Sequence, residues 1–127
     1  MRNMLKVTVF LILLSFLSLN HGNVLANDKL TLLSPNAGEV IPSGSSYTIQ
    51  WEASPDAVKF DLMYSIDGGL TWELISDGVT ITTYDWYVPV LIENESNCRI
   101  RITGYNLSNE IMSDAVSSMA FTIEAGN

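Results

Sequence analysis

Hydrophobic positions recur with a period of two along most of this chain. In the segment Tyr47–Ala53 every second residue, beginning with Tyr47, is apolar, and the residues between are polar. The same alternation appears in residues 58–65, 98–103 and 119–123. A period of two places apolar side chains on one face of an extended segment, so each of these segments is predicted to be a half-buried β-strand.

Turn-forming residues divide the chain into short extended segments. Clusters of Ser, Pro, Asn, Asp and Gly occupy residues 34–38, 43–45 and 54–56, and Asp77-Gly78 is a further turn signal. A polar loop is expected at 93–97, and the longest irregular stretch at 104–114, which contains Tyr105. The expected strands are 30–33, 39–42, 47–53, 58–65, 72–75, 79–88, 98–103 and 119–123. Seven or eight short antiparallel strands at this spacing, with no amphipathic helix, predict an all-β sandwich.

The segment from Tyr64 to Trp72 is predicted to be a β-hairpin. Asp67, Gly68 and Gly69 tolerate the positive φ angles that a tight turn between right-twisted strands requires. Tyr64 and Trp72 lie on either side of this turn, and we expect their rings to pack across the base of the hairpin.

The predicted core depends on large rings and on a single cysteine. Trp51 and Trp86 are expected to fill the space between the two sheets, and Trp72 is assigned to hairpin packing. Cys98 is either a buried small hydrophobe or a partner for a cysteine of another chain. Its alternation in phase with Ile100 and Ile102 favours burial.

The first 26 residues are expected to be a signal peptide. Arg2 and Lys6 precede the apolar run Val7–Leu19, and Ala26 provides a cleavage site. The run has 13 residues, whereas a bilayer span needs about 20, so an uncleaved membrane anchor is the weaker interpretation. We therefore predict a secreted protein (extracellular, periplasmic or on the cell surface) with one domain at residues 27–127 and no membrane span after cleavage.

Charge limits the partners of this domain. The chain has six basic and 14 acidic residues. Cleavage would remove two of the basic residues, so the net charge of residues 27–127 would be 4 − 14 = −10. Such a surface repels nucleic acid and anionic lipid, so neither is expected as a partner.

The sequence contains few of the residues on which catalysis or metal binding usually depends. The one histidine, His21, lies in the expected signal peptide, which excludes a histidine base and a His/Cys zinc site in residues 27–127. No cofactor and no enzymatic activity are expected, although residue types alone do not exclude a pair of catalytic carboxylates. Several aspartates could bind calcium, but we expect Asp67 and Asp77 to cap their own turns.

Three apolar residues form the predicted binding surface. Met63 and Tyr87 are out of phase with the core residues of their strands, and Tyr105 is in the expected long loop. If exposed, they would provide a platform for sugar rings or a protein partner.

Short motifs over Leu30–Ile123 together resemble one known family. They are Ser34-Pro35-Asn36-x-Gly38-Glu39, Gly44-Ser45 with Ile49-x-Trp51, Tyr64-Ser65-x-Asp67-Gly68-Gly69 with Trp72, Trp86-x-Val88-Pro89, Cys98-Arg99-Ile100-Arg101-Ile102, and Ser113-Asp114 before Phe121-Thr122-Ile123. They look like the Ser/Thr-rich glycosylphosphatidylinositol-anchored membrane protein family, the immunoglobulin-like N-terminal module of yeast cell-wall β-glucan assembly proteins and related bacterial modules. This resemblance implies an immunoglobulin-like sandwich and supplies no catalytic residues. The sequence shows no Ser/Thr-rich stalk or C-terminal anchor signal, so we expect no lipid anchor.

Two looser resemblances accompany it. Fibronectin type III domains are similar through Trp51 and the Arg99–Ile102 strand. The segment Ser65–Trp72 resembles the Asp-box, the S-x-D-x-G-x-T-W hairpin of sialidase propellers, which implies that Asp67 holds the turn and takes no part in catalysis.

Two hypotheses follow. The first is an exported, non-enzymatic module that binds a cell-surface or cell-wall polysaccharide. The alternative is a structural or adhesive module that acts through protein contacts, by edge-strand pairing or homo-oligomerisation.

Overall fold

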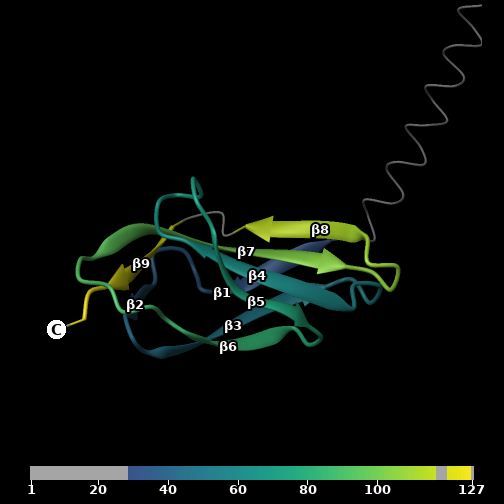
Figure 1. Ribbon diagram of the computed structural model, residues 1–127, viewed down its shortest axis with the longest axis horizontal. Helices are drawn as coiled ribbons and strands as arrows, with labels where there is room; N and C mark the ends of the chain where they lie inside the picture. The colour runs from purple at the N-terminus through teal and green to yellow at the C-terminus, as the bar shows by residue number, and fades with distance from the viewer. Residues whose placement is uncertain (1–28, 117–119, 127) are drawn as a thin grey trace, which may run out of the picture.

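The computed structural model describes residues 29–116 and 120–126, and this part of the chain folds into β-strands connected by loops (Figure 1). The strands are β1 (Leu30–Ser34), β2 (Val40–Pro42), β3 (Ser46–Ala53), β4 (Lys59–Ser65), β5 (Glu73–Val79), β6 (Thr83–Tyr87), β7 (Glu95–Tyr105), β8 (Ile111–Val116) and β9 (Phe121–Glu124). The all-β prediction is confirmed, although the described residues contain nine strands where seven or eight were expected. None of these residues belongs to a helix that could cross a membrane.

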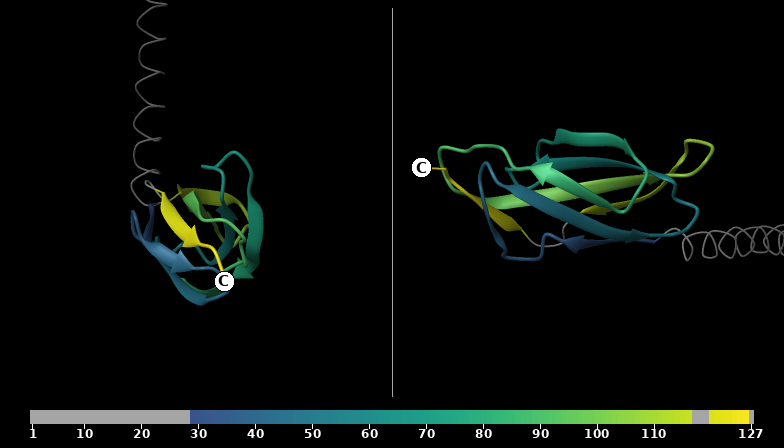
Figure 2. Two further views of the ribbon diagram at one scale, coloured as in Figure 1. Left: turned by 90° about the vertical axis from the view of Figure 1, so that its left-hand side faces the viewer. Right: turned by 90° about the horizontal axis from the view of Figure 1, so that it is seen from below.

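The strands form two sheets around a common interior, as the end-on view shows (Figure 2). The smaller sheet has the order β1-β3-β6, and the larger has the order β2-β9-β7-β4-β5, with β8 also paired to β7. β7 is long enough to pair with β9 near its beginning and with β8 near its end. The arrangement is an immunoglobulin/fibronectin-III-like sandwich.

One strand pair departs from the predicted antiparallel pattern. β2 runs parallel to β9, with Ile41 opposite Ile123. β2 follows β1 in sequence but joins the other sheet, and Gly38, whose φ is +73°, lies in the turn between them. A strand that changes sheets in this way is not revealed by the hydrophobic alternation.

Aromatic side chains connect the two sheets through the core. Trp51 and Trp86 are only 2% and 3% exposed, which agrees with the predicted alternation. The Trp51 ring meets Phe60 of the opposite sheet edge-on at 5.4 Å between centroids, and Trp86 meets Phe121 in the same way at 6.4 Å. Cys98 is a free thiol and fully buried beside them, as its phase with Ile100 and Ile102 predicts.

β5 contains a bulge where the sequence predicts a turn. Phe60 of β4 pairs with Val79 and Leu62 pairs with Ser76, so β5 carries an extra residue between these positions. Gly78 has a φ of +64° there, and its N–H donates to the Asp61 carboxylate at 3.1 Å. A glycine with positive φ therefore bends this strand without ending it.

The region predicted as the longest irregular stretch is mostly ordered strand. Gly104 and Tyr105 end β7, and β8 begins at Ile111. Asn106 closes the loop between them, because its side-chain oxygen accepts the backbone N–H groups of Ser108 and Glu110 at 3.0 and 2.9 Å.

Other expected boundaries also differ from the structure. Residues 95–97, expected in a loop, begin β7, and residues 80–82, expected to be extended, connect β5 to β6. The expected signal peptide, its cleavage site and Met119 lie outside the described residues.

Candidate functional site

Asp67 organises the loop between β4 and β5, which spans residues 66–72. Its Oδ1 accepts hydrogen bonds from Ser65 Oγ at 2.6 Å and from the Thr71 N–H at 2.9 Å, and its Oδ2 accepts from Thr71 Oγ1 at 2.5 Å. The bond from Ser65, followed by those from Thr71, lowers the pKa of Asp67 from 3.8 to about 2. The carboxylate is therefore ionised at neutral pH and fixes the loop.

The two glycines of this loop adopt the predicted left-handed conformation. Gly68 and Gly69 have φ angles of +75° and +93°. The Gly68 N–H donates to the Asn97 carbonyl at 2.9 Å, which attaches the loop to the beginning of β7. The connection is longer than the predicted tight turn, because the Asp67 side chain closes it four residues ahead at Thr71.

Tyr64 and Trp72 do not pack across the base of the hairpin as predicted. The Tyr64 ring packs against Trp86 at 5.3 Å between centroids. Trp72 instead lies against the Arg101 guanidinium, 5.4 Å from the ring centroid. Arg101 pairs with Met63, which alternates with Tyr64 along β4, so the two rings lie on opposite faces of the sheet.

The structure places two of the three predicted binding residues, Met63 and Tyr105, on one face of the larger sheet, but Met63 pairs with Arg101 and Tyr105 with Lys59, so the two side chains are not neighbours. Both are half-buried on the outer face of the larger sheet. Tyr105 donates its hydroxyl to Asp61 at 2.8 Å, and the Lys59 ammonium lies 5.2 Å from the centre of its ring. Tyr87 is 70% exposed but belongs to β6 in the other sheet, so the three side chains do not form one platform.

A different concave surface lies where side chains of β5 and β6, which belong to different sheets, line one hollow. Two hollows of about 400 and 270 Å³ meet at Tyr64, which lines both, and we call them together the edge groove. The first hollow is lined by Ser65, Asp67, Thr71, Glu73, Leu91 and Glu95, and the second by Leu74, Ile75, Tyr84, Trp86, Tyr87 and Pro89.

Aromatic rings and carboxylates lie next to each other in the edge groove. Tyr64 donates its hydroxyl to Glu73 Oε2 at 2.7 Å. Burial, strengthened by the bond to Glu73, raises the pKa of Tyr64 to about 12, so the hydroxyl remains a donor at neutral pH. The sequence pattern gives no sign of Tyr84, Glu73 or Glu95 as groove residues, because the groove forms only from strands of different sheets.

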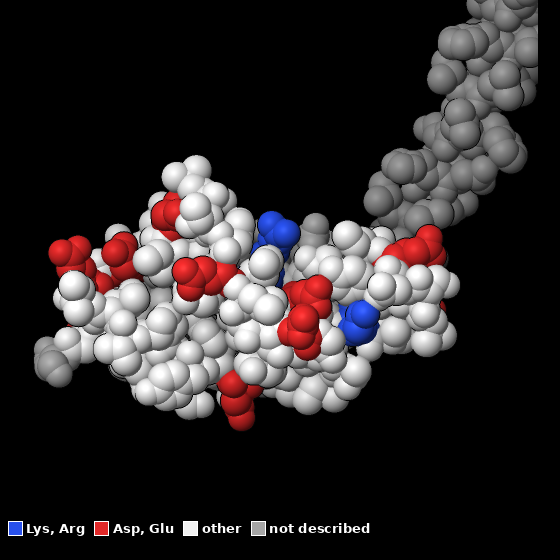
Figure 3. Space-filling view, in the orientation of Figure 1, with Lys and Arg blue, Asp and Glu red and all other residues white. Residues whose placement is uncertain are grey.

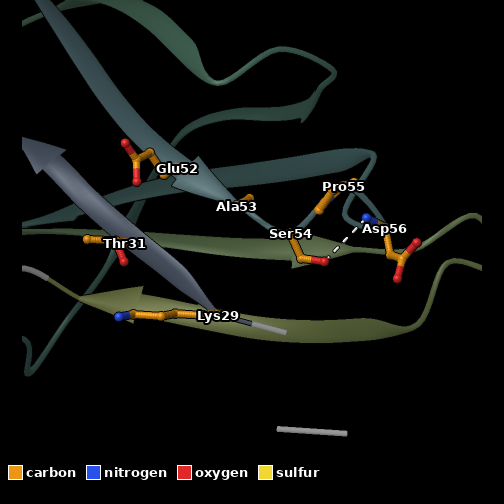
Figure 4. Close-up of a pocket in the computed structure, with 7 residues that line it drawn as sticks. All are labelled: Lys29, Thr31, Glu52, Ala53, Ser54, Pro55 and Asp56. Atoms are coloured by element: carbon orange, nitrogen blue, oxygen red, sulfur yellow. Dashed lines mark hydrogen bonds between the residues drawn. The ribbon is translucent and has the colours of Figure 1, made fainter. Parts of the chain in front are cut away.

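A separate hollow of about 420 Å³, outside the edge groove, lies beside the beginning of β1 and the turn after β3 (Figure 4). Its lining includes Lys29, Thr31, Glu52, Ser54 and Asp56, and the backbone N–H of Asp56 donates to Ser54 Oγ at 3.4 Å. The residues that line it include no aromatic ring. The edge groove, which is lined by aromatic rings, therefore resembles a binding site more closely than this hollow does.

Acidic side chains are scattered across the face shown in Figure 3, with two basic areas among them on a mainly uncharged surface. Within the described residues, no group of three or more His, Cys, Asp or Glu is arranged to hold a metal ion. The Asp67 carboxylate binds its own loop, as the resemblance to the Asp-box implies.

Comparison with known proteins supports the fold. No protein-family model and no curated protein sequence matches the chain. Among solved structures, it is similar to the fibronectin(III)-like modules of CbhA from Clostridium thermocellum, with a TM-score of 0.56 and 16% identity over 78% of this chain and 100% of that one. It is also similar to an Fn3-like protein from the same organism, with a TM-score of 0.50 and 15% identity over 78% of this chain and 90% of that one. The chain thus has a fibronectin-III-like fold.

Proposed function

We propose that this protein is an exported, non-catalytic module that binds a cell-surface or cell-wall polysaccharide in the edge groove. The observation that carries the proposal is the position of Tyr87, an exposed ring, in a groove that Glu73 and Glu95 also line. A sugar ring has apolar C–H faces that stack on aromatic rings and hydroxyls that donate to carboxylates. The edge groove offers both kinds of contact.

The character of the structural neighbours also supports a module without catalytic activity. The two solved structures are themselves described as fibronectin(III)-like and Fn3-like. Their identity to this chain is low, so they support the type of domain and leave its ligand to experiment.

A glycan-array screen tests the binding proposal. We expect the wild type to bind a subset of polysaccharides and Tyr87→Ala to lose most of that binding, because stacking on an exposed ring is worth on the order of 1 kcal/mol or more per sugar. Ile81→Ala is the matched control, since Ile81 is 61% exposed and is not among the residues that line the groove. Circular dichroism establishes that both variants are folded. Absence of binding across the array, or equal binding by Tyr87→Ala, would contradict the proposal.

Export is tested separately by expressing the full chain and sequencing the N-terminus of the secreted product. Cleavage after Ala26 predicts a product that begins at Asn27. A product that keeps Met1 and stays with the cells would overturn export.

One observation favours protein contacts as the alternative function. Exposed aliphatic side chains, among them Leu70 and the 92% exposed Ile92, lie on the two loops whose residues Thr71 and Leu91 line the groove. Ile92→Ser would weaken a protein complex formed through these loops and leave glycan binding unchanged. An Ile92→Ser variant that loses glycan binding but keeps the protein complex would contradict this alternative.

A further inference from the structure

The edge groove is acidic as well as aromatic. Asp67, Glu73 and Glu95 line its first hollow, and the residues lining the two hollows include no Lys or Arg. A groove of this kind repels anionic glycans and attracts positively charged groups.

Glu95 is the carboxylate with the fewest protein contacts in this hollow. Its residue is half-buried at the beginning of β7, and its carboxylate makes no hydrogen bond or ion pair with any residue that the structure describes. The hydrogen bond that Glu95 does accept, from the Cys98 thiol at 3.3 Å, goes to its backbone carbonyl and not to the carboxylate. A partly buried charge without a partner is available for a cation from outside.

Glu73 retains binding capacity of the same kind. Its Oε2 accepts the Tyr64 hydroxyl, and within the described part of the chain its Oε1 has no hydrogen-bond donor. Tyr87 and Tyr84 line the adjoining hollow, and a cation that approaches the face of such a ring is attracted to its π electrons. The full chain carries a net charge of −8, which favours the approach of a polycation.

We infer that the edge groove selects a polysaccharide whose sugars carry free amino groups. The ammonium groups would bind Glu95 and Glu73 in the first hollow, while the sugar rings stack on Tyr87. This inference rests on the proposed function and narrows it to one class of glycan. A neutral polysaccharide and a basic peptide are the competing ligands.

The inference is tested with short β-1,4-linked glucosamine oligomers and the same oligomers fully N-acetylated, titrated into the mature protein by calorimetry. Acetylation removes the charge and leaves the ring and linkage, so we expect at least about tenfold weaker binding of the acetylated probe. Glu95→Gln should reduce binding of the amino oligomer about tenfold and leave binding of the acetylated probe unchanged. Glu52→Gln, in the hollow of Figure 4, is the matched control and should have little effect.

The outcomes separate this inference from the proposed function. Equal affinity for both probes would overturn the selection for amino groups, while the glycan-binding proposal would stand. Binding of neither probe, together with a silent glycan array, would overturn both. An equal loss in Glu52→Gln and Glu95→Gln, or equally tight binding of a short oligolysine, would show general attraction of cations and overturn the assignment to Glu95.

Discussion

Asp67 bonds to Thr71 twice, through the backbone N–H at 2.9 Å and through the hydroxyl at 2.5 Å. These two bonds close the loop between β4 and β5. Because Asp67 and Thr71 also line the first hollow, the same contacts fix one wall of the edge groove. The stability of the loop and the shape of the groove therefore depend on one ionised carboxylate.

Acid should weaken this loop. The pKa of Asp67 is about 2 in the folded protein, below its usual 3.8, so the folded state favours the carboxylate. A depressed pKa contributes stability above about pH 4, and this contribution is lost as the pH falls from about 4 to 2. We expect Asp67→Asn to be less stable than wild type at pH 7 and to lose less stability across this range.

The measurement is urea unfolding, followed by tryptophan fluorescence, at a series of pH values. Glu52→Gln is the control, because it removes a carboxylate outside the loop. An identical pH slope in wild type and Asp67→Asn would show that the bonds of Asp67 do not contribute to stability.

Two substitutions of Trp51 separate the contribution of its ring to core packing from the contribution of its indole N–H. Its ring is buried against Phe60, and its indole N–H is buried without a hydrogen-bond partner among the described residues. Trp51→Ala should cost about 3–5 kcal/mol in the free energy of unfolding, because it removes the ring and leaves a cavity. Trp51→Phe should cost about half of that or less, because it keeps a ring and removes an unpaired donor.

Equilibrium unfolding of both variants in urea checks this pair. If Trp51→Phe costs as much as Trp51→Ala, the indole makes a contribution that its surroundings do not explain.

The alternation of apolar residues predicts most of the core but not the groove. It places Trp51, Trp86 and Cys98 correctly, because burial on one face is a local property of a strand. Tyr64 and Tyr87 line the same groove but belong to different sheets, and no local sequence pattern predicts that they lie together. The turn predicted at Asp77-Gly78 is wrong for a related reason, since a glycine with positive φ suits a bulge as well as a turn.

Gly78 gives a direct test of that bulge. A Cβ built on Gly78 has no atom within 4 Å, so a substitution there is opposed only by its φ of +64°. Gly78→Ala should cost about 1–2 kcal/mol, and Gly78→Asn less, because Asn tolerates the left-handed region better. Gly38 provides the matched control, because it has a φ of +73° and equally open surroundings.

Thermal unfolding of the alanine variants at positions 78 and 38 should give similar losses. A much larger loss at position 78 would mean that the bulge supports contacts beyond its own backbone.

The two end strands of the larger sheet, β5 and β2, both hinder strand addition, so we predict that residues 27–127 form a monomer. β5, one edge of the larger sheet, is interrupted by shifts of register on both sides of Leu62. At the opposite edge, β2 spans only Val40–Pro42 and ends in a proline. Bulges, short strands and proline all hinder the addition of another strand.

Multiangle light scattering should give the mass of one chain over a wide range of concentration, with Ile92→Ser showing the same mass. A dimer in the wild type that dissociates in Ile92→Ser would instead assign association to the exposed loops and favour the adhesive alternative.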